Sequence, residues 1–307
     1  MNANGVVEPL FRMGHADKAT KVERFTFGRY DLDVLCRRHL DQTLNFKLTV
    51  QCSKESMFES MRDFGGGMPS SDDSDGERDG EMRAQRDGES LVGDVDLLGL
   101  DVWPAAITLC QYLEMHWSQL MKGQWVIELG AGIGLPGLLC AQMGASKAVI
   151  TDYDPKVVSH VFENAKKCSV PECTGICLDW TKYDKDAAGH EQLYGVVLAA
   201  DILYDGGIVK DLVDTVEYVM QPCGLLLISH QQRRSLVLDD MKIPTVVEED
   251  VSFQKFRKLI LARGFFMRIL GERESPGFPG SMMMLGFSRD KERLESIPAY
   301  PEMKTLL

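Results

Sequence analysis

The sequence has no apolar run that approaches the length of about 20 residues needed to cross a bilayer. Its first 18 residues contain no apolar segment, so we expect no secretory signal. The eight cysteines include no C-x-x-C pair, and we therefore expect free thiols in a reducing compartment and no metal site. These absences predict a soluble protein of the cytoplasm, with the nucleus as a second compartment and no membrane partner.

Positive charge is also scarce. The chain has 34 Lys and Arg residues against 46 Asp and Glu residues, which gives a formal net charge of -12. Proteins that bind nucleic acids usually present a basic face to the phosphates, so this balance argues against such a ligand. It favours a basic protein partner or a small cationic ligand. Hydrophobic residues make up 44% of the 307, an ordinary share for a globular protein with a core.

Three regions differ in composition. Residues 1–64 hold short β-prone runs at 24–27, 32–35 and 46–50, and we expect a small β-hairpin extension there. Residues 65–93 are rich in Gly, Ser, Asp and Arg and cannot bury enough apolar area to offset their ordering entropy. We predict a disordered acidic insertion, which is either a tolerated loop expansion or a phosphorylatable partner-binding segment. Residues 94–307 form the main domain.

Strand and helix patterns alternate from residue 97 onward. Five apolar strands are predicted, at 124–128, 148–151, 175–178, 195–200 and 224–229. Most of them are followed by apolar residues at helical spacing. Two further strands, at 265–270 and 282–287, are joined without a helix, which suggests one antiparallel strand. We therefore predict an α/β fold with a doubly wound, seven-stranded, mostly parallel sheet. Ligands of such sheets bind beyond the carboxyl ends of the strands.

A glycine-rich loop, Glu128-Leu-Gly-Ala-Gly-Ile-Gly-Leu-Pro-Gly137, follows the first strand. Its last three glycines match G-x-G-x-x-G, and Asp152 lies about 20 residues on, as in a site for NAD. However, a carboxylate at the strand end would repel a pyrophosphate and suits the cationic amino group of a methionine. The E-x-G-x-G-x-G register favours S-adenosylmethionine as the cofactor, with the loop contributing Glu128, Gly130, Ala131, Gly132 and Gly134.

Polar and aromatic side chains follow the other strands. Asp152 ends the second strand and can accept hydrogen bonds from ribose hydroxyls, whereas Asp154 stands before a proline and is assigned to helix capping. Asp179 follows the third strand and can accept from an adenine amino group, while Trp180 offers a flat face for the ring. Trp103 precedes a helix and is either a cover for the sulfonium or a simple packing residue.

The segment Ala199-Ala200-Asp201-Ile-Leu-Tyr204 follows the most apolar strand, which we expect to be central. Asp201 should point into the crevice, and Tyr204 lies one turn further on. With VWPAA, ELGAGIG, TD, LDW and AADILY in this order, the chain resembles the protein-lysine methyltransferases of the methyltransferase-like family 21 and its relatives, also called methyltransferase family 16. The resemblance covers roughly residues 97–235.

The resemblance implies S-adenosylmethionine as cofactor, a sheet whose last strand is antiparallel, and a target-lysine channel lined by Asp201 and Tyr204. It also implies a set of cofactor contacts: Trp103, Gly130, Gly132, Asp152, Trp180 and Ala200. The expected activity is methyl transfer to a lysine of a protein partner, by a monomeric enzyme. Methylation of a protein histidine or a small amine stays open, as does a non-catalytic interaction protein.

Three polar residues after the fifth strand are open to a catalytic reading. His230 is interpreted as a loop histidine whose hydrogen bonds are satisfied, in preference to a catalytic histidine. Arg233 and Arg234 are interpreted as solvated and not as ligands.

Overall fold

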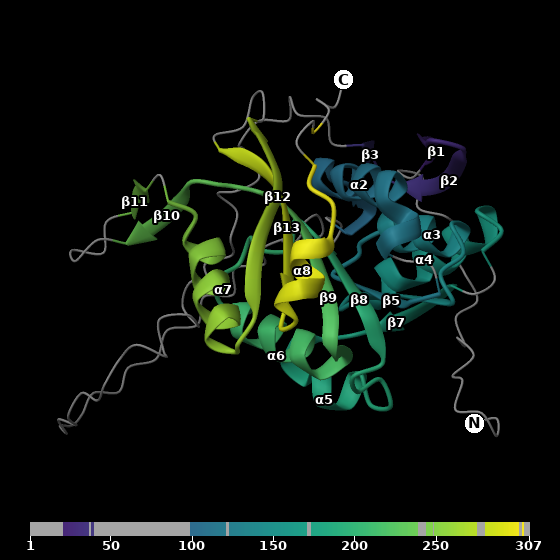
Figure 1. Ribbon diagram of the computed structural model, residues 1–307. Coiled ribbons are helices and arrows are strands. Elements are labelled where there is room, and N and C mark those ends of the chain that lie inside the picture. The colour runs from purple at the N-terminus through teal and green to yellow at the C-terminus, as the bar shows by residue number, and fades with distance from the viewer. Residues whose placement is uncertain are drawn as a thin grey trace, which may run out of the picture.

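The computed structural model describes residues 21–36, 38–39, 99–120, 123–170, 173–238, 244–247, 249–274, 280–300 and 303 (Figure 1). The predicted strand at 46–50 and the predicted insertion at 65–93 lie outside these residues. Within the described ranges, no helix is both long and apolar enough to span a membrane.

A seven-stranded sheet organises the chain, in the order β12-β13-β9-β8-β5-β6-β7. Its five parallel strands are β5 (Trp125–Leu129), β6 (Lys147–Asp152), β7 (Cys173–Cys177), β8 (Tyr194–Ala200) and β9 (Met220–Gln231). The strand β13 (Ser281–Ser288) runs antiparallel to both of its neighbours, β9 and β12 (Phe266–Glu274). This topology confirms the predicted doubly wound sheet with one antiparallel strand.

Helices cover both faces of the sheet (Figure 1). One face packs against α2 (Pro104–Leu120), α3 (Leu135–Gln142), α4 (Pro155–Lys167) and α8 (Lys291–Ser296). The other packs against α6 (Val209–Val219) and α7 (Val251–Ala262), with η2 (Trp180–Lys182) and α5 (Tyr183–Asp186) beside α6. Side chains alternate along each strand, so Val126 joins the core under α2 and Ile127 the core under α6. The last helix of the described structure, α8, follows β13.

The N-terminal hairpin is part of the packed structure. Its antiparallel strands are β1 (Lys21–Phe27) and β2 (Tyr30–Cys36), as predicted at 24–27 and 32–35. Leu32 shares a core with Ile133 and Leu138. Buried Asn164 of α4 accepts a hydrogen bond from the amide of Leu35 at 2.6 Å and donates to its carbonyl at 3.3 Å. The hairpin is therefore anchored to the helices that follow the glycine-rich loop in the chain.

Two short strand pairs complete the described structure. β3 (Arg38–His39) pairs in parallel with β4 (Asp101–Val102). β10 (Ser235–Leu238) pairs antiparallel with β11 (Pro244–Val247) and forms an arm that extends from the sheet end next to α7 (Figure 1). This arm was not predicted from the sequence.

Candidate active site

The loop between β5 and α3 turns on glycines at three alternate positions. Gly130, Gly132 and Gly134 have φ angles of 59°, 56° and 82°, a region that side chains rarely adopt. A Cβ on Gly132 would lie 2.7 Å from the carbonyl oxygen of Gly99, and a Cβ on Gly130 would lie 3.2 Å from the ring of Trp180. The loop therefore needs glycine both for its conformation and for the close packing around it.

The carboxyl group of Glu128 is buried at the end of β5 and contacts the start of α3. Glu128 is only 1% exposed, and its Oε2 accepts a hydrogen bond of 2.7 Å from the amide of Gly137 in the first turn of α3. Gly137 leaves room for this contact, because a Cβ there would lie 2.8 Å from Oε2. Glu128 fixes the start of α3 to the end of β5 through this oxygen. Its contact with a methionine amino group stays a prediction.

The protonation of Glu128 is unusual. Burial raises its pKa to about 8, although the hydrogen bond from Gly137 acts in the opposite direction. In either protonation state the Gly137 amide is engaged from inside the protein. A pyrophosphate at a helix N-terminus needs such amides free, so this contact weakens the dinucleotide alternative.

Asp152 links the glycine loop to the end of β6. It is 7% exposed, and its Oδ2 accepts from the amide of Gly132 at 2.9 Å while its Oδ1 accepts from the amide of Asp154 at 3.2 Å. Burial raises its pKa above the ordinary value. Each carboxylate oxygen retains a second lone pair, so Asp152 can still accept from ribose hydroxyls. Asp154 caps α4 by accepting from the amide of Lys156 at 2.7 Å, as predicted.

Asp179 is a helix cap as well as a candidate adenine contact. Its Oδ1 accepts from the amide and the hydroxyl of Thr181 at 3.0 and 2.7 Å, and its Oδ2 lies 2.7 Å from the ammonium of Lys182. The hydrogen bond from Lys182 lowers the pKa of Asp179, so the group is an ionised acceptor. Trp180 is half-buried and packs beside Gly130, whereas Trp103 is half-buried directly before α2.

Asp201 follows β8 in a strained conformation. Its φ angle is 59°, which a residue with a side chain adopts only at a cost of about 1 to 3 kcal/mol. Its amide donates to the carbonyl of Ser229 at 2.9 Å, so the turn is tied to β9. The side chain is 6% exposed and reaches Arg233 and His230 near the end of β9. Strain of this kind is concentrated at functional sites, which supports Asp201 as a site residue.

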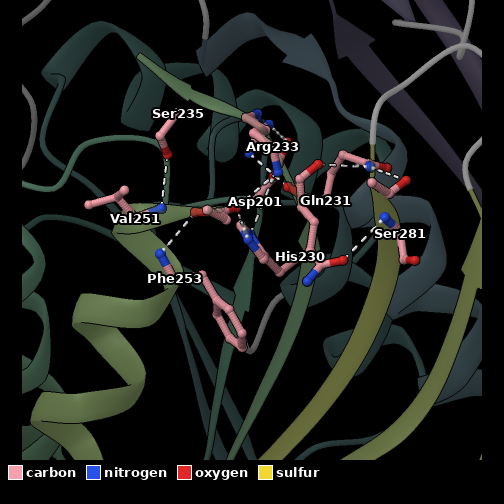
Figure 2. A network of polar contacts seen from close by, with 11 residues as sticks. Asp201, His230, Gln231, Arg233, Ser235, Val251, Phe253 and Ser281 are labelled. Atoms are coloured by element: carbon pink, nitrogen blue, oxygen red, sulfur yellow. Dashed lines mark hydrogen bonds and ion pairs between the residues drawn. The ribbon is translucent and has the colours of Figure 1, made fainter. Parts of the chain in front are cut away.

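A polar network surrounds the carboxyl group of Asp201 (Figure 2). Arg233 Nη2 lies 2.5 Å from Asp201 Oδ2, and His230 Nδ1 lies 4.0 Å from Asp201 Oδ1. His230 Nε2 lies 2.9 Å from Asp250 Oδ2, which also accepts from the amide of Arg233 at 2.9 Å. Asp250 Oδ1 accepts from the amide of Phe253 at 2.9 Å and so caps α7. The network joins the ends of β8 and β9 to the start of α7.

Two interpretations from the sequence need correction here. Arg233 is not solvated, because its side chain is 23% exposed and paired with Asp201. His230 is not in a loop, because it lies within β9 and is fully buried. Asp250 was missed altogether. Its position before an apolar helical pattern, three residues ahead of Phe253, marks a helix cap but carries no signal of contact with His230.

The remaining candidates lie at the same end of the sheet. Ala131 and Ala200 are half-buried where β5 and β8 end. Tyr204 is 60% exposed, in contrast to buried Asp201, so the two are at different depths. Tyr153, directly after Asp152, is 65% exposed. This end of the sheet thus has a buried carboxylate, Asp201, and two exposed aromatic residues, Tyr153 and Tyr204.

The chain is similar in sequence to known proteins. A sequence model of the family described as lysine methyltransferase matches residues 91–242. The chain is 33% identical over 160 residues to the protein N-lysine methyltransferase METTL21A of Xenopus tropicalis, a match that covers 50% of this chain and 71% of that one. It is 31% identical over 147 residues to the protein N-terminal and lysine N-methyltransferase efm7 of Neurospora crassa, covering 43% and 52%.

A third relative has a different named target. The chain is 30% identical over 125 residues to the histone-arginine methyltransferase METTL23 of Rattus norvegicus, covering 40% of this chain and 54% of that one. The chain thus spans about half the length of the efm7 and METTL23 relatives. It covers more than two thirds of METTL21A at 33% identity. The range matched by the family model, residues 91–242, includes the glycine loop, Asp152 and Asp201. The chain belongs to the lysine methyltransferase family.

Proposed function

We propose that this chain transfers the methyl group of S-adenosylmethionine to the ε-amine of a lysine on another protein. The observation that carries the proposal is the set of partners of the two carboxylate oxygens of Asp201. Arg233 occupies one oxygen of its buried carboxylate, and the other oxygen, Oδ1, has no hydrogen-bond partner in the part of the chain that the structure describes. A buried acceptor of this kind requires a donor, and a lysine ammonium supplies one.

The residues at the ends of β5, β6 and β7 fit an adenosylmethionine. The loop backbone from Gly130 to Gly134 would approach its methionine part, with Ala131 and Ala200 beside it. Asp152 would accept from the ribose hydroxyls, and Asp179 and Trp180 would hold the adenine. Trp103 would cover the sulfonium, where an indole face contributes about 0.5 to 2 kcal/mol to binding a cation. When bound, this cofactor supplies an electrophilic methyl group.

The protein's own task is to prepare the amine. A lysine attacks only as the free amine, and its unperturbed pKa of about 10.4 keeps it protonated near neutrality. Asp201 attracts the ammonium and orients it toward the methyl carbon, while Tyr204 at the surface restricts the alkyl chain. Holding the reacting atoms in line can contribute about 7 to 11 kcal/mol of barrier reduction.

The geometry supports lysine over arginine as the target residue. A guanidinium binds carboxylates preferentially through two parallel hydrogen bonds to both oxygens. Arg233 already occupies Oδ2 of Asp201, which leaves a single oxygen for the substrate. One oxygen suits an ammonium better than a guanidinium.

The acidic charge of the chain supports a basic segment around the target lysine. We infer a monomeric enzyme that meets its target in the cytoplasm or nucleus.

Mass spectrometry of lysates from cells that lack the protein tests the proposal. We expect one lysine to lose its methylation, and the purified chain to restore it with labelled S-adenosylmethionine. Label on arginine, on histidine, on an N-terminal amine or on a small molecule would contradict the lysine assignment. Failure of the purified chain to bind S-adenosylmethionine in calorimetry would contradict the enzyme assignment and favour an interaction protein.

A further inference from the structure

The outer edge of β12 carries exposed apolar side chains. β12 is an edge strand of the sheet, with α7 on one side of it and α8 on the other, so one row of its backbone N–H and C=O groups faces away from β13 (Figure 1). Phe266 and Ile269 of β12 are 45% and 50% exposed, and Leu261 of α7 is 39% exposed. Edge strands are commonly guarded by charged side chains or proline against pairing with other chains. This edge instead presents apolar side chains beside its outward backbone groups.

A groove of about 380 Å³ follows this edge. Arg257 and Leu261 of α7 line it together with Lys291 and Glu295 of α8, so the groove lies along both faces of β12. Successive side chains of an extended segment point to opposite faces, and a segment that adds to the edge would fill the groove on both faces of the strand. The shape of the groove therefore suits an added β-strand.

The edge is open to another strand over a short stretch. The pairing of β12 with β13 is regular from Phe266 to Ile269, and a bulge follows between Ile269 and Gly271. At the bulge, the carbonyl of Leu270 accepts from the amide of Tyr300 at 2.6 Å. A bulge interrupts the pairing of a strand with its neighbours. Among the residues that the structure describes, the stretch open to a further strand is therefore Phe266–Ile269.

Positive charge gathers at this groove, although the whole chain has a formal net charge of -12. The lining includes three cations, Arg257, Arg268 and Lys291, and one carboxylate. That carboxylate, Glu295, lies 3.7 Å from Lys291 with both side chains 64% exposed, so the ion pair between them is weak. Arg257 is exposed and has no ion pair within the described part of the chain. An acidic partner complements this excess of positive charge.

A second copy of this chain is a poorer occupant of the groove. Pairing of two Phe266–Ile269 stretches would gather Arg257, Arg268 and Lys291 of both copies at one interface. Like charges brought together in this way oppose association. The charge of the groove therefore favours a different protein with acidic residues over self-association.

We propose that the edge of β12 binds an extended, acidic segment of a partner protein as an added β-strand. The backbone of the segment pairs with Phe266–Ile269, its apolar side chains cover Phe266 and Leu261, and its carboxylates pair with Arg257 and Lys291. β12 runs in the same direction as β9, because both are antiparallel to β13. The groove therefore lies toward the amino ends of the strands, whereas the candidate active site lies at their carboxyl ends. Binding at the groove leaves that site accessible.

Fluorescence anisotropy with labelled synthetic peptides tests the proposal on the full chain. The probe is a short peptide of repeated Ile-Ile-Glu-Glu, because each face of it carries both apolar and acidic side chains when it is extended. Its counterpart has lysine in place of glutamate. We expect the acidic peptide to bind at least about tenfold more tightly than the lysine peptide, and its affinity to fall as salt is added. The net charge of the whole chain predicts the opposite preference, so the comparison isolates the groove.

Substitutions in the groove and away from it locate the binding site. The double variant Arg257→Glu, Lys291→Glu should weaken binding of the acidic peptide by about tenfold or more. Phe266→Thr, which keeps a β-branched side chain but removes the ring, should also weaken it. Lys166→Glu is the charge-matched control, because Lys166 is exposed on α4, and it should leave binding within about twofold. Melting temperatures and calorimetric binding of S-adenosylmethionine close to wild type show that the variants are folded.

Amide hydrogen exchange distinguishes strand addition from simple contact with the groove. We expect the acidic peptide to slow exchange within Phe266–Ile269 by about tenfold or more, because newly paired amides are protected. The strand β7, at the opposite edge of the sheet, is the internal control and should be unchanged. A peptide methylated on alternate backbone nitrogens keeps its charges but loses pairing donors, and it should give no such protection.

Four outcomes would overturn the inference, and the proposed methyl transfer would stand in each case. The first is equal or weaker binding of the acidic peptide compared with the lysine peptide, or no binding of either. The second is binding that the Arg257 and Lys291 double variant leaves unchanged. The third is binding without slower exchange in Phe266–Ile269. The fourth is a dimer in sedimentation that Phe266→Thr dissociates, since the occupant would then be a second copy.

Discussion

Arg233 Nη2 and Asp201 Oδ2 are 2.5 Å apart at the end of the sheet, although 32 positions separate the two residues along the chain. Burial works against the charge of Arg233, but Asp201 raises its pKa further above the ordinary value, so the guanidinium stays charged. The ion pair leaves one carboxylate oxygen of Asp201 for another partner and joins the turn after β8 to the chain after β9.

Removal of one partner of this ion pair should lower the free energy of unfolding. Arg233→Gln leaves the carboxylate of Asp201 buried without its counter-charge, and we expect a loss of about 2 to 3 kcal/mol in the free energy of unfolding. The double variant with Asp201→Asn should be less destabilised than the sum of the single variants, by about 1 to 2 kcal/mol. Urea unfolding measures the cycle. Lys291→Gln, which removes an exposed pair with Glu295, is the control and should change stability by about 0.5 kcal/mol or less. Additive losses at Asp201 and Arg233 would contradict the coupling.

Removal of the Asp201 charge should slow turnover strongly while the cofactor still binds. For Asp201→Asn we expect labelling to fall by about 100-fold to 1,000-fold, because the ammonium loses the group that orients it. The dissociation constant for S-adenosylmethionine should stay within about twofold, since most of the proposed cofactor contacts follow β5, β6 and β7 and not β8. Asp205→Asn is the control in the same segment, because among the residues that the structure describes Asp205 accepts only from the amide of Gly207. Unchanged turnover in Asp201→Asn would refute the role of Asp201.

Gly132 should be less tolerant of alanine than another glycine of similar conformation. Gly132→Ala brings a Cβ within 2.7 Å of the carbonyl oxygen of Gly99, whereas Gly144, with a φ of 91°, has nothing within 4 Å. Both substitutions carry the strain of a left-handed residue, about 1 to 2 kcal/mol. Only Gly132→Ala should also weaken S-adenosylmethionine binding, by about tenfold or more, when both are measured by calorimetry. Equal behaviour of the two variants would show that the loop has room to adjust.

Glu128 should make the stability of the protein depend on pH. Its folded pKa of about 8 lies above the ordinary 4.5, so the folded state holds a proton that the unfolded chain releases. The contribution of Glu128 to the free energy of unfolding is therefore highest below pH 4.5 and falls as the pH rises toward 8. Glu128→Gln removes this dependence and keeps an acceptor for Gly137. We expect the variant to gain about 2 to 4 kcal/mol relative to wild type between pH 5 and pH 8.5, measured by urea unfolding. A constant difference across this range would contradict the buried proton.

The sheet could be predicted from the sequence because its strands obey local rules. Runs such as Gly195–Ala200 are continuously apolar, as strands buried on both faces must be, and β8 covers this run. Asp154 before Pro155 is a local helix start, and the structure has the cap as expected. The arm of β10 and β11 has weaker patterns and was not predicted.

The polar network could not be predicted, since its contacts join distant parts of the chain. Nothing near His230 in sequence indicates that Asp250, 20 positions away, will accept its Nε2 hydrogen. Arg233 and Arg234 are adjacent and of one type, and nothing in the sequence indicates that Arg233 pairs with Asp201. Glu128 occupies the strand end that was predicted, but the space left by Gly137 determines the direction of its side chain.

The anchoring of β1 and β2 by Asn164 has a practical meaning for anyone who shortens this protein. A chain that starts at residue 94, the expected start of the main domain, would lack the hairpin. Ile133 and Leu138 would then lose the residues that cover them, and the carboxamide of Asn164 would lose its hydrogen bonds with Leu35. Each unmatched polar group in such a position costs about 1 to 3 kcal/mol. We therefore expect a chain that keeps the hairpin from Lys21 onward to be more stable than one that starts at residue 94.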